Sequence, residues 1–99
     1  MKCKSKMLEK EIEHRMCKLV REHGGLIYKF VGLENGLPDR IFILPGGDVW
    51  FVELKTKKGR LSKIQNYQIS RLKKQGANVR TVYGYDDVVK FIEEVMGDG

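Results

Sequence analysis

The chain has 99 residues, 41% of them hydrophobic and 32% charged, with 19 Lys and Arg against 13 Asp and Glu for a formal net charge of +6. This length and composition predict one domain over residues 1–99, exclude a disordered or fibrous protein, and favour a polyanionic partner such as nucleic acid. Without a membrane-length apolar run or a signal-peptide core, and with only Cys3 and Cys17, we expect a cytoplasmic protein with no membrane partner.

The first predicted element is a helix over residues 5–23, with Ser5 as candidate N-cap and Gly24-Gly25 as its end. Its apolar stripe consists of Leu8, Ile12, Met16, Leu19 and Val20. LIYKFV over 26–31 is typical of a strand, and the turn-rich GLENGLPD follows it. These patterns place a helix before the first strand.

RIFIL over 40–44 predicts a second strand, joined by the tight turn Pro45-Gly46-Gly47-Asp48 to a third strand, VWFVELK. A second helix is expected from Ser62 to about Gln75 and a fourth strand over 78–85. Asp86 or Asp87 can cap a last helix that runs to about Met96. The order α-β-β-β-α-β-α predicts α/β architecture, in which three antiparallel strands and one returning strand form a mixed sheet flanked by helices.

The third strand carries two charges among apolar residues, Glu53 and Lys55. Burying an unpaired charge costs several kcal/mol, so these residues require partners. Alternation along a strand puts both on one face, and the hairpin brings Asp39 alongside them. Mg²⁺ takes oxygen ligands and usually one or two carboxylates, so this sheet end is a candidate hard-cation site.

Polar residues on both helices point toward the same place. Glu9 and Glu13 are spaced i, i+4, and Glu13 falls within the apolar stripe, while Gln65 lies on the inward side of the second helix. Each charge also has a simpler explanation: Glu53 and Lys55 as an edge-strand pair in water, Asp39 as a turn residue, and the glutamates as solvated partners of Lys10 or Lys6. The coincidence of Asp39, Glu53 and Lys55 in one geometry favours the cation site.

Pro38-Asp39, thirteen intervening residues and then Glu53-Leu54-Lys55 resemble the PD-(D/E)XK nuclease motif. With GGLIYKF, GLPDR, ILPGG, FVELK and Gln65 in this order, the chain resembles the stand-alone viral or phage form of the VRR-NUC (virus-type replication-repair nuclease) family from about Glu9 to Ile92. The resemblance implies a restriction-endonuclease-like fold with an αβββαβ core. It also implies metal-dependent hydrolysis of DNA phosphodiester bonds.

The resemblance also implies roles for individual residues. Asp39 and Glu53 would ligate Mg²⁺ or Mn²⁺ with the Leu54 backbone carbonyl, and Lys55 would orient or activate the attacking water. Gln65 matches the family glutamine. Glu9 and Glu13 both remain candidates for the helix glutamate, with Glu13 preferred on periodicity. The implied catalytic set is therefore Asp39, Glu53, Lys55, Gln65 and Glu13.

Basic residues follow the third strand directly. The candidate phosphate contacts in TKKGRLSK are Lys57, Lys58, Arg60 and Lys63, and Arg71, Lys73 and Lys74 come shortly after. Stand-alone members of the family imply a homodimer acting on branched DNA, including four-way junctions, so a Holliday-junction resolvase is expected. The alternatives are a nicking or end-processing nuclease, a DNA-binding module with an inactive site, and a non-catalytic subunit of a repair assembly.

Overall fold

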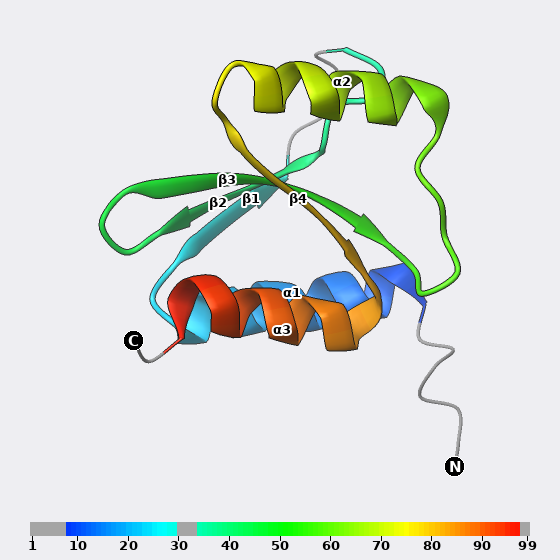
Figure 1. Cartoon of the computed structure of the whole chain (residues 1–99). Coiled ribbons are helices and arrows are strands. Elements are labelled where there is room, and N and C mark those ends of the chain that lie inside the picture. Colours follow the sequence, from blue (N-terminus) through cyan, green and yellow to red (C-terminus); the bar gives the residue numbers. More distant parts are fainter. Residues whose placement is uncertain (1–7, 30–33, 98–99) are drawn as a thin grey trace.

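A computed structural model describes residues 8–29 and 34–97 of the chain. Its elements, shown in Figure 1, are α1 (Glu9–Glu22), β1 (Leu26–Lys29), β2 (Arg40–Leu44), β3 (Asp48–Lys55), α2 (Lys63–Lys74), β4 (Asn78–Tyr83) and α3 (Gly84–Met96). The four strands form one sheet in the order β1-β2-β3-β4, with the first three antiparallel and β4 parallel to β3. The predicted α/β class, element order and mixed sheet are confirmed.

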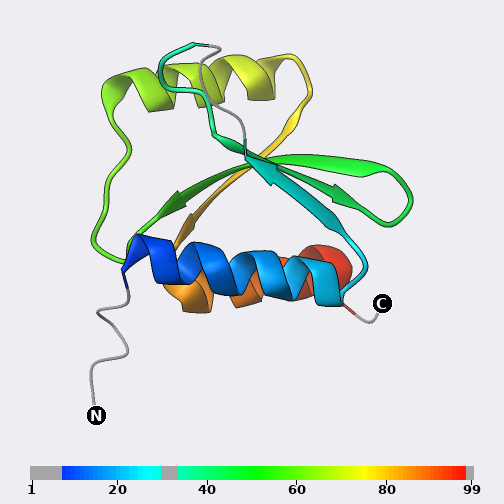
Figure 2. The same ribbon diagram turned by 180° about the vertical axis from the view of Figure 1, so that it is seen from behind.

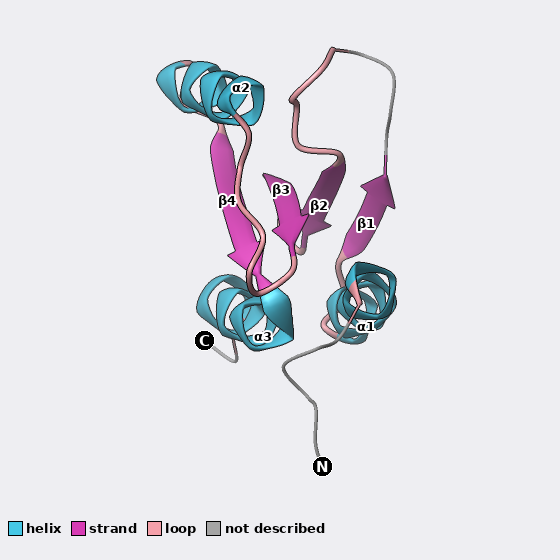
Figure 3. Ribbon diagram, turned by 90° about the vertical axis from the view of Figure 1, so that its right-hand side faces the viewer, coloured by secondary structure: helices cyan, strands magenta, loops and turns pink. Residues whose placement is uncertain are grey.

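The sheet separates one helix from the other two. Figures 1 and 2 show α1 and α3 side by side on one face and α2 on the opposite face. Turned by 90°, Figure 3 shows α2 above the β4 side of the sheet. Gln65 of α2 contacts Glu53 of β3, so α2 covers the face on which Glu53 lies.

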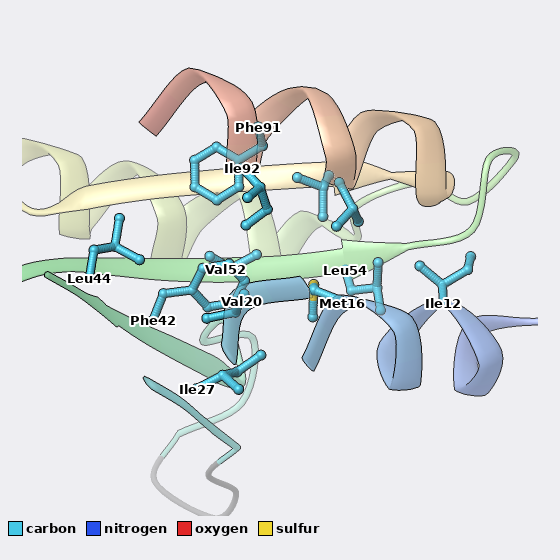
Figure 4. Close-up of a cluster of buried hydrophobic side chains, with 12 residues drawn as sticks. Ile12, Met16, Val20, Ile27, Phe42, Leu44, Val52, Leu54, Phe91 and Ile92 are labelled. Atoms are coloured by element: carbon cyan, nitrogen blue, oxygen red, sulfur yellow. The ribbon is translucent and has the colours of Figure 1, made fainter. Parts of the chain in front are cut away.

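The main core fills the space between the sheet and the α1/α3 layer (Figure 4). Its buried side chains are Ile12, Met16, Val20, Ile27, Phe42, Leu44, Val52, Leu54, Val82, Val88, Phe91 and Ile92. Trp50 packs against this cluster, with its ring edge-to-face on Phe91 at 5.1 Å between centroids. Val52 and Leu54 thus face the core, and Glu53 between them faces the other side, as strand alternation predicts.

The boundaries of α1 and α2 follow their caps. The predicted start at Ser5 lies outside the described residues, and α1 begins at Glu9 after Leu8. It ends before Gly24, whose φ of +86° suits glycine. The α2 boundaries are confirmed, because Ser62 caps its first turn and Gln75 follows its last. None of the helices in 8–29 and 34–97 has both the length and the apolar character that crossing a bilayer requires.

The predicted boundary between β4 and α3 is wrong. The strand ends at Tyr83 instead of Tyr85, and the helix begins at Gly84 without a side-chain cap. Gly84 has a φ of +81°, a conformation that glycine adopts without steric cost and that turns the chain directly from strand to helix. Asp86 and Asp87 therefore lie in the first helical turn, where they complement the helix dipole. The Asp87 carboxylate accepts a hydrogen bond from the Tyr83 backbone N–H at 2.8 Å.

Candidate active site

Glu53 lies in an interior strand, because β3 runs between β2 and β4. The alternative that Glu53 and Lys55 are an edge-strand pair in water is therefore wrong. Arg40 pairs with Val52 across β2 and β3, so Asp39 adjoins Glu53 one position further along. Glu53 is only 7% exposed, whereas Asp39 and Lys55 are half-buried. The fold brings a buried carboxylate, a second carboxylate and an ammonium group to one end of the sheet.

Two side chains hold the Glu53 carboxylate. The Lys55 Nζ lies 3.8 Å from Glu53 Oε2, and Gln65 Nε2 donates a hydrogen bond to the same oxygen at 3.3 Å. Two hydrogen bonds to Ser62 hold Gln65 in place. The Gln65 Oε1 accepts from the Ser62 backbone N–H at 2.9 Å, and the Gln65 backbone N–H donates to Ser62 Oγ at 3.2 Å. This capping box uses the carbonyl oxygen of the Gln65 amide and directs its NH₂ group to Glu53.

The charge of Glu53 is costly in this setting. Burial raises the pKa of the Glu53 carboxyl above its ordinary value, and the neighbouring Asp39 carboxylate raises that pKa further. The cations of Lys55 and Arg40 act in the opposite direction, and the Glu9 carboxylate adds a smaller increase. The two positive charges therefore do not fully offset desolvation and the neighbouring carboxylates.

Arg40 is a site residue that sequence reasoning missed. It is 2% exposed, and its Nη1 donates to Asp39 Oδ1 at 2.7 Å while its Nη2 lies 2.9 Å from Glu13 Oε1. Its Nε has no hydrogen-bond partner among the residues that the structure describes. The available signal was strand alternation, which puts residue 40 on the same buried face as Phe42. A buried guanidinium there needs carboxylates, and Asp39 and Glu13 supply them.

The two helix glutamates occupy different electrostatic positions. Glu13 pairs with Arg40 and lies 4.0 Å from Lys29 Nζ, so it connects to Asp39 through the guanidinium. Glu9 contributes directly to the raised pKa of Glu53. Both glutamates thus adjoin the cluster, Glu13 through a counter-ion and Glu9 through its own charge. Which of them takes part in the chemistry stays a prediction.

The donor set at this end of the sheet suits a hard divalent cation. Asp39 and Glu53 offer carboxylate oxygens, and the pKa of Glu53 is raised first by burial and then by the Asp39 charge, both of which a bound cation would counteract. The Leu54 side chain is buried in the core and has no donor atom, so the main-chain carbonyl is the group of this residue that could serve as a ligand. Over residues 8–29 and 34–97, no group of three or more His, Cys, Asp or Glu side chains could hold a metal ion. Mg²⁺ commonly uses one or two protein carboxylates and completes its shell with water and substrate phosphate.

The predicted phosphate contacts lie beside this cluster. A groove of about 670 Å³ is lined by Lys57, Lys58, Gly59, Arg60, Leu61, Asn66 and Tyr83. The β3–α2 connection turns at Gly59, whose N–H donates to the Thr56 carbonyl at 2.9 Å. Lys58, Arg60 and Lys63 are exposed, and the exposed Lys57 Nζ lies 3.7 Å from Asp86 Oδ2. The loop therefore presents its cations along a polar groove next to Lys55.

Comparison with known proteins identifies the family. Residues 1–86 match the VRR-NUC domain. The chain belongs to the VRR-NUC family. A solved structure described as "VRR_NUC domain" is 33% identical, with a TM-score of 0.79 over 86% of this chain and 94% of that one. Another, "VRR_NUC domain protein", is 19% identical with a TM-score of 0.74 over 99% and 94% and supports the fold alone.

A curated relative of this VRR-NUC chain comes from a phage. The protein "Putative nuclease p44" of Acyrthosiphon pisum secondary endosymbiont phage 1 is 38% identical over 65 residues, which is 65% of this chain and 70% of that protein. Membership of the family confirms the resemblance on which the sequence-based site assignment depends. The positions that resemble the PD-(D/E)XK motif also lie close together, because Arg40 pairs with Val52 and Asp39 is a neighbouring charge of Glu53.

We predict that Glu53→Gln raises the melting temperature at neutral pH. A carboxyl whose pKa is raised by folding is harder to ionise in the folded state, so stability falls as pH rises from the ordinary glutamate pKa through the raised one. The gain should therefore vanish below about pH 4, where the carboxyl is neutral in both states. Thermal unfolding from about pH 3 to 8 measures this gain in melting temperature. Glu11→Gln on the exposed side of α1 is the control, and equal pH profiles for the two variants would contradict the prediction.

Glu13→Gln should lower the free energy of unfolding by about 1–3 kcal/mol, because the buried Arg40 guanidinium loses one of its two counter-charges. Glu9→Gln should leave stability within about 0.5 kcal/mol of the parent, because Glu9 is exposed. It should lower the pKa of Glu53, since it removes a neighbouring negative charge. Denaturant unfolding tests both variants. A larger loss for Glu9→Gln than for Glu13→Gln would reverse these assignments.

Proposed function

We propose that the protein is a metal-dependent, structure-selective DNA endonuclease that hydrolyses phosphodiester bonds with Mg²⁺ or Mn²⁺. One observation carries this proposal: the buried Glu53 carboxylate lies between Lys55 and Gln65 and beside Asp39 in an interior strand. An arrangement that concentrates negative charge in a desolvated position has no evident structural benefit. Membership of the VRR-NUC family and the nuclease name of the phage relative support the same chemistry.

Asp39 and Glu53, with the Leu54 carbonyl, are the residues that would hold the cation. Nucleases of the PD-(D/E)XK type typically use divalent metal ions, and a bound divalent cation would lower the pKa of the attacking water and offset charge on the phosphate. Arg40 Nη1 donates to Asp39 Oδ1 at 2.7 Å, so the other carboxylate oxygen of Asp39, Oδ2, would serve as the metal ligand. The two carboxylates thus have different supports, a guanidinium for Asp39 and an amide for Glu53.

Lys55 and Gln65 act on the reacting groups in different ways. The Lys55 ammonium would orient the attacking water and stabilise negative charge on the phosphate in the transition state. The Gln65 amide is a positioning group, because its hydrogen bond at 3.3 Å fixes the orientation of the Glu53 carboxylate. Glu13 would keep Arg40 in place, and Glu9 would add to the negative charge that attracts the cation.

The exposed lysines and arginine of the β3–α2 connection, Lys57, Lys58 and Arg60, together with Lys63, would contact DNA phosphates. Contacts of this kind give affinity and register without reading sequence. Their groove opens next to Lys55, so a strand lying in it would place a phosphodiester bond near the Glu53 cluster. The formal charge of +6 adds long-range attraction to DNA.

The substrate and assembly that we propose are a four-way or otherwise branched DNA junction and a homodimer, as in a Holliday-junction resolvase. A two-fold dimer presents two equivalent sites, which suits paired incisions in a symmetric junction. Apolar side chains on the sheet face away from α1 and α3 offer a contact surface: Leu26 is 51% exposed, Tyr28 55% and Val49 39%. Leu26, Ile43 and Val49 form one row across three strands, so a second copy could cover them together.

Cleavage assays test this proposal. We expect purified protein to cut a labelled four-way junction at paired positions with Mg²⁺ or Mn²⁺, and to cut a flap and a linear duplex at least about tenfold more slowly. Glu53→Gln should lower the rate by at least about 100-fold, while retaining DNA binding, because it removes a charged metal ligand. Glu11→Gln is the matched control and should cut like the parent.

Each other outcome assigns a different function. Equal cutting of every substrate would leave a nuclease and remove the junction preference. Single-strand cuts or trimming from ends would indicate a nicking or end-processing enzyme. Full activity of Glu53→Gln in folded protein would refute the site assignment. Tight junction binding without cleavage would indicate a non-catalytic DNA-binding subunit, and a monomer in sedimentation would refute the homodimer.

A further inference from the structure

Charge is distributed unequally between the two faces of the sheet. Residues 55–74 contain eight Lys or Arg and no Asp or Glu, so the rest of a chain with net charge +6 carries a net −2. The helix α2 alone carries four basic and no acidic side chains, whereas α1 is neutral and α3 has a net charge of −3. Figures 1 and 3 show α2 alone on its face of the sheet. The four basic side chains of α2 thus lie on the face that holds Glu53, whereas Lys57 of the preceding loop lies beside Asp86 of α3.

Core packing explains little of the α2 sequence. Only Gln68 and Ile69 of this helix are buried, and Gln68 donates to Glu34 Oε1 at 2.8 Å and to the Asn35 carbonyl at 3.2 Å. The exposed residues of α2 are Lys63, Ile64, Asn66, Tyr67, Ser70, Arg71, Lys73 and Lys74. The helix therefore buries few side chains and turns a broad basic surface to solvent.

We propose that the outer face of α2 is a second DNA-binding surface, formed by Tyr67, Arg71, Lys73 and Lys74, that holds the phosphate backbone several nucleotides from the cleaved bond. This inference rests on the proposed function, because the contact of Gln65 with Glu53 places the N-terminal end of α2 at the catalytic cluster. From Gln65 to Arg71 and Lys74 is about 9–14 Å along the helix axis. At about 3.4 Å of duplex axis per nucleotide of one strand, the contacted phosphates lie about three to four nucleotides from the cleaved bond.

Arg71 is already oriented for this contact. Its guanidinium carbon lies 5.5 Å from the centre of the Tyr67 ring, and the Tyr67 side chain is 58% exposed. Stacking on an aromatic ring holds a guanidinium in a defined plane and keeps its N–H groups available to acceptors. In Arg71, Nη1 donates a long hydrogen bond to Gln68 Oε1 at 3.4 Å. Glu34 Oε1 lies 3.9 Å from Arg71 Nη1, but both side chains are more than half exposed, so a phosphate can replace this weak partner.

The same surface has an apolar component, which raises the question of a protein partner. Ile64 is 46% exposed beside Tyr67. However, the cations of Lys63, Arg71 and Lys74 lie around these two side chains on the helix. No carboxylate on α2 pairs with these cations. Charge complementarity therefore favours a polyanion over an apolar protein surface.

Binding of an uncleaved junction tests the proposal. In the Glu53→Gln background, the α2 variant combines three further changes, Arg71→Gln, Lys73→Gln and Lys74→Gln. We would measure its dissociation constant for the junction between 50 and 200 mM salt. The control, the α1 variant, combines Lys10→Gln, Lys18→Gln and Arg21→Gln in the same background. These changes remove three exposed charges from α1 on the opposite face of the sheet. Circular dichroism melting confirms that both variants are folded.

We expect the α2 variant to bind at least about tenfold more weakly and its salt slope to fall by about 2–3, one unit for each lost phosphate contact. The α1 variant should stay within about threefold of the parent. Equal effects of the two variants would overturn the proposal, since only net charge would matter. Unchanged DNA binding with a changed oligomeric state would overturn it in favour of a protein interface. If the parent did not bind DNA at all, the proposed function would be refuted together with the α2 surface. Failure of the function is therefore distinguishable from failure of the α2 surface alone.

Neutral methylphosphonates locate the contact on the DNA. Replacing single phosphates three or four nucleotides from the cut site should weaken binding by the parent several-fold and have little further effect in the α2 variant, because the partner charges are already gone. Substitution at the cut site itself should weaken both proteins equally. An identical position profile for the two proteins would overturn the proposed contact.

Discussion

The buried carboxylate of Glu53 is the constraint on which the arrangement of the site depends. An interior strand does not hold a charge without partners, and the fold supplies two of them, Lys55 from the same strand and Gln65 from α2. It also places a like charge, the Asp39 carboxylate before β2, beside Glu53. Lys55 and Gln65 stabilise the charge, while burial opposes it most and the Asp39 carboxylate adds to this effect, so the pKa of Glu53 stays raised. A bound divalent cation would favour the ionised form, and we propose that this cost in stability serves a functional site.

The same constraint links distant parts of the fold. The capping box at Ser62 starts α2 and orients the Gln65 amide, so helix initiation and the position of the Glu53 carboxylate both depend on the Gln65 side chain. Arg40 connects Asp39 to Glu13 and therefore ties the start of β2 to α1. Of the basic residues that follow Lys55, Lys57 lies at the end of the sheet beside Asp86 of α3, and those of α2 lie on the face of Glu53. A polyanion that contacts α2 would therefore approach the same face as a metal ion.

Much of this could be predicted from the sequence, because helix stripes, strand alternation and turn residues are local signals. Alternation alone placed Glu53 opposite the core, and the tight hairpin brought Asp39 beside it. The start of α3 was misplaced because the aspartates after Tyr85 are typical caps, and only the φ of +81° at Gly84 shows that the helix begins there. Strand alternation indicated that Arg40 is buried, and its counter-ion Asp39 is the preceding residue, but its other counter-ion, Glu13, comes from α1, a tertiary relation that no local pattern reveals.

The most direct test is the pKa of Glu53 itself, measured by carbon-13 NMR of the side-chain carboxyl with and without Mg²⁺. We expect a pKa above the ordinary glutamate value in metal-free protein and a fall below that value with saturating Mg²⁺, because a bound cation favours the ionised form. Asp39→Asn should lower the metal-free value and weaken the response to Mg²⁺. An ordinary pKa that Mg²⁺ leaves unchanged would contradict the assignment of Glu53 as a buried metal ligand.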